Sequence, residues 1–142
     1  MGTKFWLAEY GIYIAWATTL TSLVGSLYFS EIVGIVPCVL CWYQRIAMYP
    51  LVAIIATGII RRDKNVSVYV LPLSIIGAII ALYQNLLVWN VVSETLTPCI
   101  IGVSCITQTF MLLNFITIPL LSLAAFVLIT ILMAVHWKSN HA

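Results

Sequence analysis

The sequence predicts an all-α membrane protein, a bundle of four transmembrane helices with two cysteine-bearing loops outside the cytoplasm. Three observations predict it. Of the 142 residues, 63% are hydrophobic and only 7% are charged. The apolar residues gather in four long stretches, and a helix needs about 20 of them to cross a hydrocarbon core of about 30 Å. The four cysteines all lie between these stretches, which occupy residues 10–29, 42–60, 68–90 and 115–136.

The four spans follow one another with short connections. Behind Lys4, apolar sequence continues as far as Phe29, so the first span is expected to be an uncleaved anchor rather than a signal peptide. The second and third spans are joined by "RRDKN" (61–65), which is too short to hold a domain. We therefore expect residues 1–142 to form a single integral membrane domain.

Basic residues predict the orientation of the spans. Lys4, the link at 61–65 and Lys138 carry five of the six basic residues, whereas segments 30–41 and 91–114 contain neither lysine nor arginine. Because lysine and arginine accumulate in cytoplasmic loops, both termini are expected in the cytoplasm and the cysteine loops outside it. The predicted location is the cell membrane.

All the cysteines fall in the two segments expected outside: Cys38 and Cys41 in the first, Cys99 and Cys105 in the second. An oxidising compartment is implied, where disulfides form and persist. A disulfide between Cys99 and Cys105 would be either an ordinary stabilising bond or an exposed bond that is readily attacked. A zinc site made by all four cysteines is a further alternative, but it requires four thiolates, which an oxidising exterior opposes; no metal is expected.

Cys38 and Cys41 form a C-x-x-C, a spacing found in reversible dithiols and in half zinc sites. Cys41 stands about where the second span begins, and the positive end of a helix favours a thiolate. Arg45 follows four residues later, on the same helix face. An arginine there could simply reach the lipid headgroups, but it is the only basic residue near the outer side, which favours a local role.

If both pairs are redox-active, electrons pass between them by thiolate attack, and an oxidant must remove them. The sequence has no nucleotide-binding fingerprint and no C-x-x-C-H haem attachment site. An oxidant dissolved in the bilayer is therefore expected. A quinone near Cys41 fits, with Arg45 stabilising the negative charge that develops on a ring oxygen.

Four segments resemble the DsbB family of thiol:quinone oxidoreductases, closest to its Gram-positive BdbC type. They are "GSLYFSEI" (25–32), "PCVLCWYQRIAMYP" (37–50), "YVLPLSIIGA" (69–78) and "FITIP" (115–119). The resemblance implies a four-helix membrane enzyme of disulfide bond formation. It implies a DsbA/BdbD-like thioredoxin-fold partner, whose electrons go to a quinone, either menaquinone or ubiquinone. Membrane lipid is the other expected partner, and no nucleic acid is expected.

The resemblance also implies roles for the motif residues. Cys38 and Cys41 match the quinone-proximal pair, and Arg45 matches the arginine beside the quinone. Cys99 and Cys105 match the pair that exchanges with the partner, with Cys99 accepting the partner's attack. Cys105 would then exchange with Cys38, which leaves Cys41 to meet the quinone.

The sequence departs from relatives at two places. Only five residues separate Cys99 from Cys105, whereas Gram-negative relatives space this pair widely. Several relatives have a quinone-contacting histidine near the outer end of the third span, where this chain has "LYQNLL" (82–87). Gln84 or Asn85 would donate a hydrogen bond to the quinone instead, or would join two helices. Trp42, beside Cys41, is a further candidate for the wall of the quinone site.

Two other functions remain open from the residues alone. The chain would be a non-enzymatic membrane protein whose disulfides stabilise its outer loops, or a membrane protein with a four-cysteine metal site.

Overall fold

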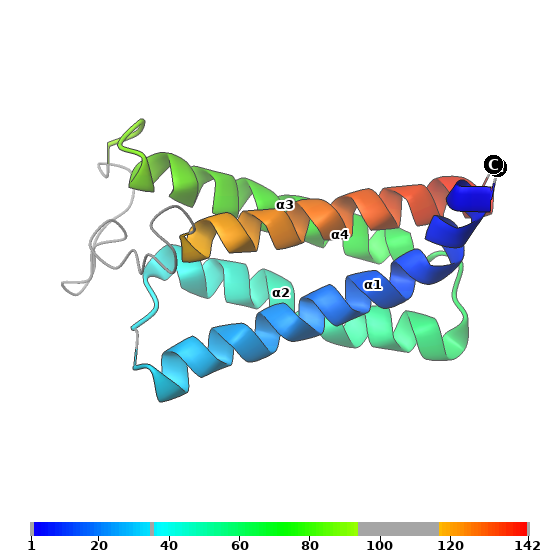
Figure 1. Ribbon diagram of the computed structural model, residues 1–142, viewed down its shortest axis with the longest axis horizontal. Helices are drawn as coiled ribbons and strands as arrows, with labels where there is room; N and C mark the ends of the chain where they lie inside the picture. Colours follow the sequence, from blue (N-terminus) through cyan, green and yellow to red (C-terminus); the bar gives the residue numbers. More distant parts are fainter. Residues whose placement is uncertain (1, 35, 94–116, 142) are drawn as a thin grey trace.

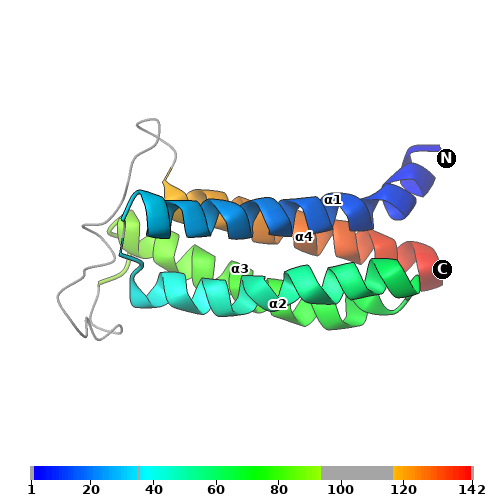
Figure 2. The same cartoon turned by 90° about the horizontal axis from the view of Figure 1, so that it is seen from below.

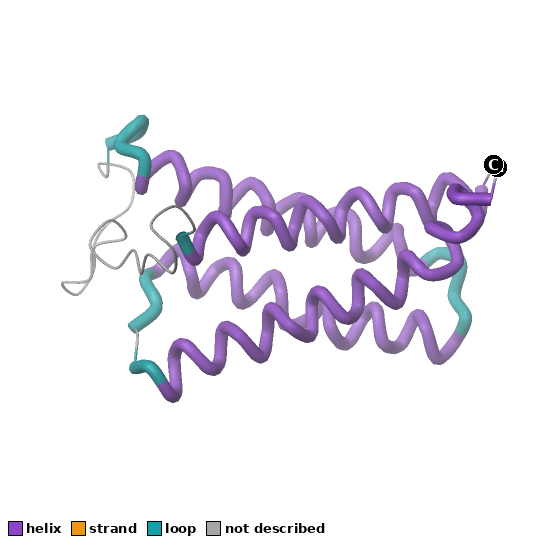
Figure 3. Tube along the Cα trace, in the orientation of Figure 1, coloured by secondary structure: helices purple, strands orange, loops and turns teal. Residues whose placement is uncertain are grey.

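The computed structural model describes residues 2–34, 36–93 and 117–141 of the chain (Figure 1). Nearly all of these residues are helical (Figure 3). The helices are α1 (Gly2–Leu27) with the π-helical turn η1 (Tyr28–Ile32) directly after it, α2 (Val39–Arg61), α3 (Val66–Val88) and α4 (Ile118–His141). All four long helices are long and apolar enough to cross a membrane. The prediction of an all-α fold with four spans is confirmed.

The helices extend beyond the predicted spans at several ends. α1 begins at Gly2 rather than near residue 10, and α4 continues to His141. α2 begins at Val39, three residues before the predicted start, with Cys38 as its extended N-cap (φ −70°, ψ 170°). Hydropathy marks the membrane-embedded part of a helix, whereas the backbone hydrogen bonds continue through its polar ends. The earlier start of α2 places Cys41 within the first helical turn.

Each helix packs on its sequence neighbours, and α4 closes the bundle by packing on α1. Both termini lie at one end, together with the link between α2 and α3 (Figures 1 and 2). The C-terminal ends of α1 and α3 and the N-terminal ends of α2 and α4 lie at the other end. The chain therefore passes along the bundle four times, and each helix runs opposite to the one before it.

The interior combines large apolar side chains with close helix contacts. Leu51, Ile55, Phe126 and Met133 are fully buried. At Gly77 of α3, an added Cβ would overlap the Phe126 ring of α4. Small residues at such contacts let transmembrane helices approach closely, so this pair fixes the register of α3 against α4.

Buried hydrogen bonds also join α3 to α4. The Thr130 hydroxyl donates to Ser74 Oγ at 3.0 Å, and Ser67 Oγ lies 3.1 Å from His136 Nδ1. Near the other end, Asn85 Nδ2 donates to the Pro119 carbonyl at 3.0 Å. Bonds of this kind stabilise membrane bundles by about 0.6 kcal/mol each on average.

Candidate thiol redox site

The first cysteine pair lies at the N-terminus of α2. Cys38 caps the helix, and its carbonyl accepts the first-turn bond from the Trp42 N–H at 3.1 Å. The Cys38 side chain is only 5% exposed, and Cys41 is partly exposed. The Cys38 thiol donates to Cys41 Sγ, with the two sulfurs 3.2 Å apart.

Gln84 of α3 reaches the two sulfurs from the neighbouring helix. Its Nε2 donates to Cys41 Sγ at 3.3 Å and to Cys38 Sγ at 3.4 Å. Cys41 Sγ therefore accepts from a thiol and an amide, and it lies at the positive end of α2, an arrangement that stabilises a thiolate. Burial acts in the opposite direction, because a charge loses hydration when it leaves water. A negative charge on Cys41 thus depends on these donors.

Gln84 is itself held by a chain of hydrogen bonds. Gln44 Nε2 of α2 donates to Gln84 Oε1 at 2.6 Å, and Ser122 Oγ of α4 donates to Gln44 Oε1 at 2.6 Å. This series of hydrogen bonds therefore runs from α4 through α2 to α3 and ends at the sulfurs. These hydrogen bonds join α4 to α2, which do not pack on each other as sequence neighbours do, and α2 to its neighbour α3.

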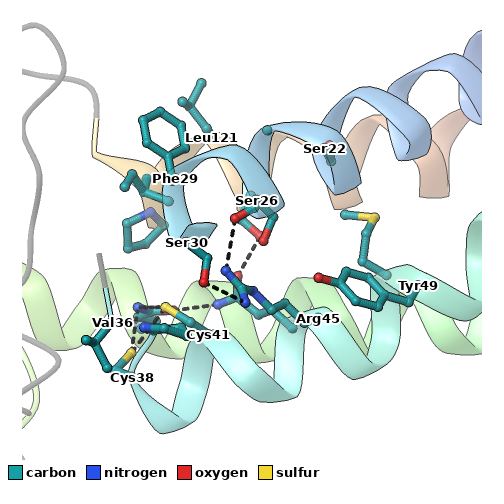
Figure 4. A pocket seen from close by; sticks show the side chains of 18 of the residues that line it. Ser22, Ser26, Phe29, Ser30, Val36, Cys38, Cys41, Arg45, Tyr49 and Leu121 are labelled. Atoms are coloured by element: carbon teal, nitrogen blue, oxygen red, sulfur yellow. Dashed lines mark hydrogen bonds between the residues drawn. The ribbon is translucent and has the colours of Figure 1, made fainter. Parts of the chain in front are cut away.

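Arg45 extends from α2 toward the end of α1 (Figure 4). Its Nη2 donates to the Ser26 carbonyl at 3.0 Å, and its Nη1 donates to Ser30 Oγ at 3.5 Å. Ser30 belongs to the π-helical turn η1, a kind of distortion that is frequent at functional sites. The centre of the Trp42 ring lies 5.5 Å from the guanidinium carbon. The charge of Arg45 is therefore fixed between α1 and α2.

A cavity of about 360 Å³ joins these groups. Most of its wall is apolar, with side chains such as Phe29, Met48 and Leu121, and all four helices contribute to it. The polar groups on the wall include both sulfurs and the Arg45 guanidinium. The polar lining residues are Thr21, Ser22, Ser26, Ser30, Cys38, Cys41, Gln44, Arg45, Tyr49, Gln84 and Ser122. Small-molecule sites typically have volumes of about 300–1,000 Å³ and mostly apolar walls with a few convergent polar groups. The cavity beside Cys41 therefore has the size and the wall of a small-molecule site.

Residues 9–136 match the family described as "Disulfide bond formation protein DsbB". This chain belongs to the DsbB family. It is 47% identical to disulfide bond formation protein C of Bacillus subtilis (strain 168) over 122 residues, which cover 86% of this chain and 88% of that protein. It is 42% identical to a probable disulfide formation protein of Chlamydia trachomatis over 135 residues, 94% of this chain and 97% of that protein. No solved structure matches it.

Membership of the DsbB family confirms the resemblance inferred from the cysteine motif. The protein is a membrane oxidoreductase of disulfide bond formation. The alternative of a non-enzymatic membrane protein is thereby set aside.

The structure brings four of the predicted site residues to this cavity: Cys38, Cys41, Arg45 and Gln84. Asn85 is fully buried and instead bonds to the Ala81 and Pro119 carbonyls, which corresponds to the helix-joining alternative. Trp42 is 53% exposed and is not among the cavity-lining residues; it adjoins the site through Arg45. Cys99 and Cys105 lie outside the described residues.

Gln44 and Ser122 were not predicted from the sequence. Gln44 follows Cys41 by three residues, so helical spacing places both on one face, and this signal was available within the DsbB-type motif. Ser122 gives no such signal, since it is a single hydroxyl in an apolar span. Its role depends on how α4 is rotated toward α2.

The described part of the chain contains no group of three or more histidine, cysteine, aspartate or glutamate side chains that could hold a metal ion. The four-cysteine alternative needs Cys99 and Cys105, which are not among the described residues.

Proposed function

We propose that this protein oxidises the dithiol of a DsbA/BdbD-like thioredoxin-fold partner and passes the two electrons to a membrane quinone. The observation that carries the proposal is the cavity in which Cys41, Arg45 and Gln84 meet. A dithiol, a fixed positive charge and an apolar wall are the groups that a thiol-to-quinone transfer requires. Family membership supports disulfide formation, and the cavity supports a quinone as the acceptor.

The first half of the reaction is thiol–disulfide exchange. A thiolate of the reduced partner attacks Cys99 in a Cys99–Cys105 disulfide and forms a mixed disulfide, which the partner's second thiolate breaks. The partner leaves with a disulfide, and Cys99 and Cys105 keep the two electrons and two protons as a dithiol. Cys105 then attacks Cys38 in a Cys38–Cys41 disulfide and releases Cys41. Cys99 displaces Cys38, which restores the Cys99–Cys105 disulfide.

The second half takes place in the cavity. Cys38 and Cys41 give two electrons and two protons to the quinone, which leaves as the quinol, and they return to the disulfide. Cys41 is the donor to the quinone because it is the less buried sulfur and accepts two hydrogen bonds. Arg45 offsets the negative charge that develops on the acceptor oxygen. The quinone, menaquinone or ubiquinone, supplies a two-electron acceptor that is soluble in the bilayer.

We also propose that the cavity end of the bundle faces the outside of the cell and that both termini are cytoplasmic, with residues 1–142 forming one membrane domain. The support is the distribution of charge. Arg61, Arg62 and Lys64 lie at the same end as both termini (Figure 1). Cys38 and Cys41 lie at the opposite end, at the start of α2.

The test mixes the purified protein with a reduced thioredoxin-like partner and a soluble quinone analogue, and follows quinone absorbance. We expect reduction by the wild type and background rates for Cys41→Ser. Thr130→Val serves as the control, because it removes the hydrogen bond from Thr130 to Ser74, which lies far from the cysteines. The proposal fails if Cys41→Ser reduces quinone as fast as the wild type, or if the wild type does not exceed background.

A further inference from the structure

We propose that Gln44 is a positioning residue, which together with Ser122 holds Gln84 with its NH₂ group toward the cysteine sulfurs. The inference rests on the proposed function in one respect: it assumes that a Cys41 thiolate donates the electrons. The residues involved lie on three helices, with Ser122 on α4, Gln44 on α2 and Gln84 on α3.

The direction of the hydrogen bonds carries the argument. A glutamine side chain has an acceptor oxygen on one side and a donor NH₂ on the other. Ser122 Oγ donates to Gln44 Oε1, which leaves Gln44 Nε2 to donate to Gln84 Oε1, both at 2.6 Å. Gln84 Nε2 is then the group that faces the sulfurs, at 3.3 Å and 3.4 Å. The two amides are therefore coupled, because reversing either one alone would place two donors or two acceptors face to face.

Reversing Gln84 alone would be unfavourable at both ends of its amide. Its Nε2 would face Gln44 Nε2, so two donors would meet at short distance, and its Oε1 would face the sulfurs. Gln44 is 7% exposed and Gln84 is 2% exposed, so little of either side chain is open to bulk water that could satisfy the mismatched groups. Buried polar groups that lose their partners incur a desolvation penalty, which opposes the reversed orientation.

The orientation matters because Cys41 changes charge during turnover. A thiolate is stabilised by the Gln84 NH₂ and repelled by the Gln84 oxygen. Without Gln44, Gln84 would be able to adopt both orientations, and fewer Cys41 side chains would be thiolates at a given pH. Gln44 thus acts on the reacting sulfur through Gln84.

The test compares Gln44→Met, Gln84→Met and the double variant, because methionine has a similar length but neither donates nor accepts strongly. The reduced full-length proteins are alkylated with iodoacetamide over a range of pH, and label at Cys41 is quantified by tandem mass spectrometry. Gln44→Met is expected to slow alkylation at neutral pH roughly 10-fold, the size of one hydrogen bond to a charged group. The pH profile should move to higher pH. The double variant should react no more slowly than Gln84→Met alone.

Two further variants separate positioning from a general loosening of the bundle. Ser122→Thr keeps the hydroxyl and should retain the wild-type profile, whereas Ser122→Ala should move it in the same direction as Gln44→Met. Thr130→Val removes a different hydrogen bond between α3 and α4, the one from Thr130 to Ser74, and should leave the pH profile unchanged. Thermal unfolding of each variant checks that the bundle is intact.

The inference is overturned if Gln44→Met alkylates with the wild-type profile, or if the effects of Gln44→Met and Gln84→Met add in the double variant. Alkylation requires no quinone, so its outcome is independent of the quinone assay. A wild type that fails to reduce quinone but shows the expected alkylation profiles would refute the proposed function and leave the role of Gln44 standing.

Discussion

Arg45 has neutral partners for its positive charge. The Ser26 carbonyl and the Ser30 hydroxyl accept its hydrogen bonds, and the centre of the Trp42 ring lies 5.5 Å from the guanidinium carbon. These contacts orient the guanidinium without neutralising it. The charge therefore remains able to act on an anionic oxygen in the adjoining cavity.

Arg45→Met should reduce the kcat of quinone reduction by roughly 10- to 100-fold, because one electrostatic stabiliser of the developing charge is lost. Arg45→Lys should give an intermediate rate, since lysine keeps the charge but not the planar fork. Steady-state rates with a soluble quinone analogue measure both variants. Trapping of a mixed disulfide with the partner serves as the control and should be unaffected; equal loss in both assays would contradict a role limited to the acceptor.

At this scale the sequence predicted the charged and sulfur-bearing residues of the site and offered Gln84 as a candidate, but it did not predict Gln44. Cys38, Cys41 and Arg45 stand out because a cysteine motif and a charge are rare in an apolar span. Gln84 was predicted together with Asn85, and only the rotation of α3 distinguishes them: Gln84 faces the sulfurs and Asn85 faces α4. Neighbouring residues on a helix point in directions about 100° apart, so sequence adjacency does not imply a shared role.

The elements that shape the site are the end of α1 and the start of α2. The π-helical turn η1 places Ser30 beside Arg45, while the last turn of α1 provides the Ser26 carbonyl. The predicted first span ends at Phe29, within this turn, and its hydropathy gives no indication of a π-helical turn. Such a turn depends on local backbone geometry that apolar composition does not encode.

Ser30→Ala should have a much smaller effect than Arg45→Met. The Ser30 hydroxyl is 3.5 Å from Arg45 Nη1, a long and weak hydrogen bond, whereas the Ser26 backbone carbonyl at 3.0 Å is kept in the variant. We expect the kcat of quinone reduction to fall by no more than about threefold, which corresponds to about 0.6 kcal/mol. A loss as large as that of Arg45→Met would mean that Ser30 contacts the substrate itself.

The contact between α3 and α4 at Gly77 provides a test of packing. Gly77→Ala should lower the free energy of unfolding by about 1–3 kcal/mol, because the new Cβ would overlap the Phe126 ring in a close-packed interior. Gly11→Ala is the matched control, since a Cβ there meets Leu132 at an ordinary 3.8 Å. Thermal unfolding in detergent measures both. Equal stability of the two variants would contradict the close approach of α3 and α4.

At the scale of the whole molecule, the sequence predicted the four long helices of the described residues and their alternating direction, but not which faces meet. In a soluble bundle an apolar stripe marks the buried side of each helix. In a bilayer the lipid-facing side is as apolar as the interior, so this signal is lost. Exposed Ile60 and Ile79 and buried Ile55 and Ile129 illustrate the point. The chain of hydrogen bonds from Ser122 to the sulfurs was therefore visible only in the folded bundle.

The arrangement of the ends predicts a labelling pattern in cells. Glu31 lies at the cavity end of the bundle and Lys64 lies in the link at the opposite end, and both are exposed. With the four native cysteines changed to serine, Glu31→Cys should react with a membrane-impermeant maleimide in intact spheroplasts. Lys64→Cys should react only after the membrane is permeabilised, because the proposed orientation places the basic link in the cytoplasm. The reverse pattern would invert the topology and place the redox site in a reducing compartment, where its disulfides would not persist.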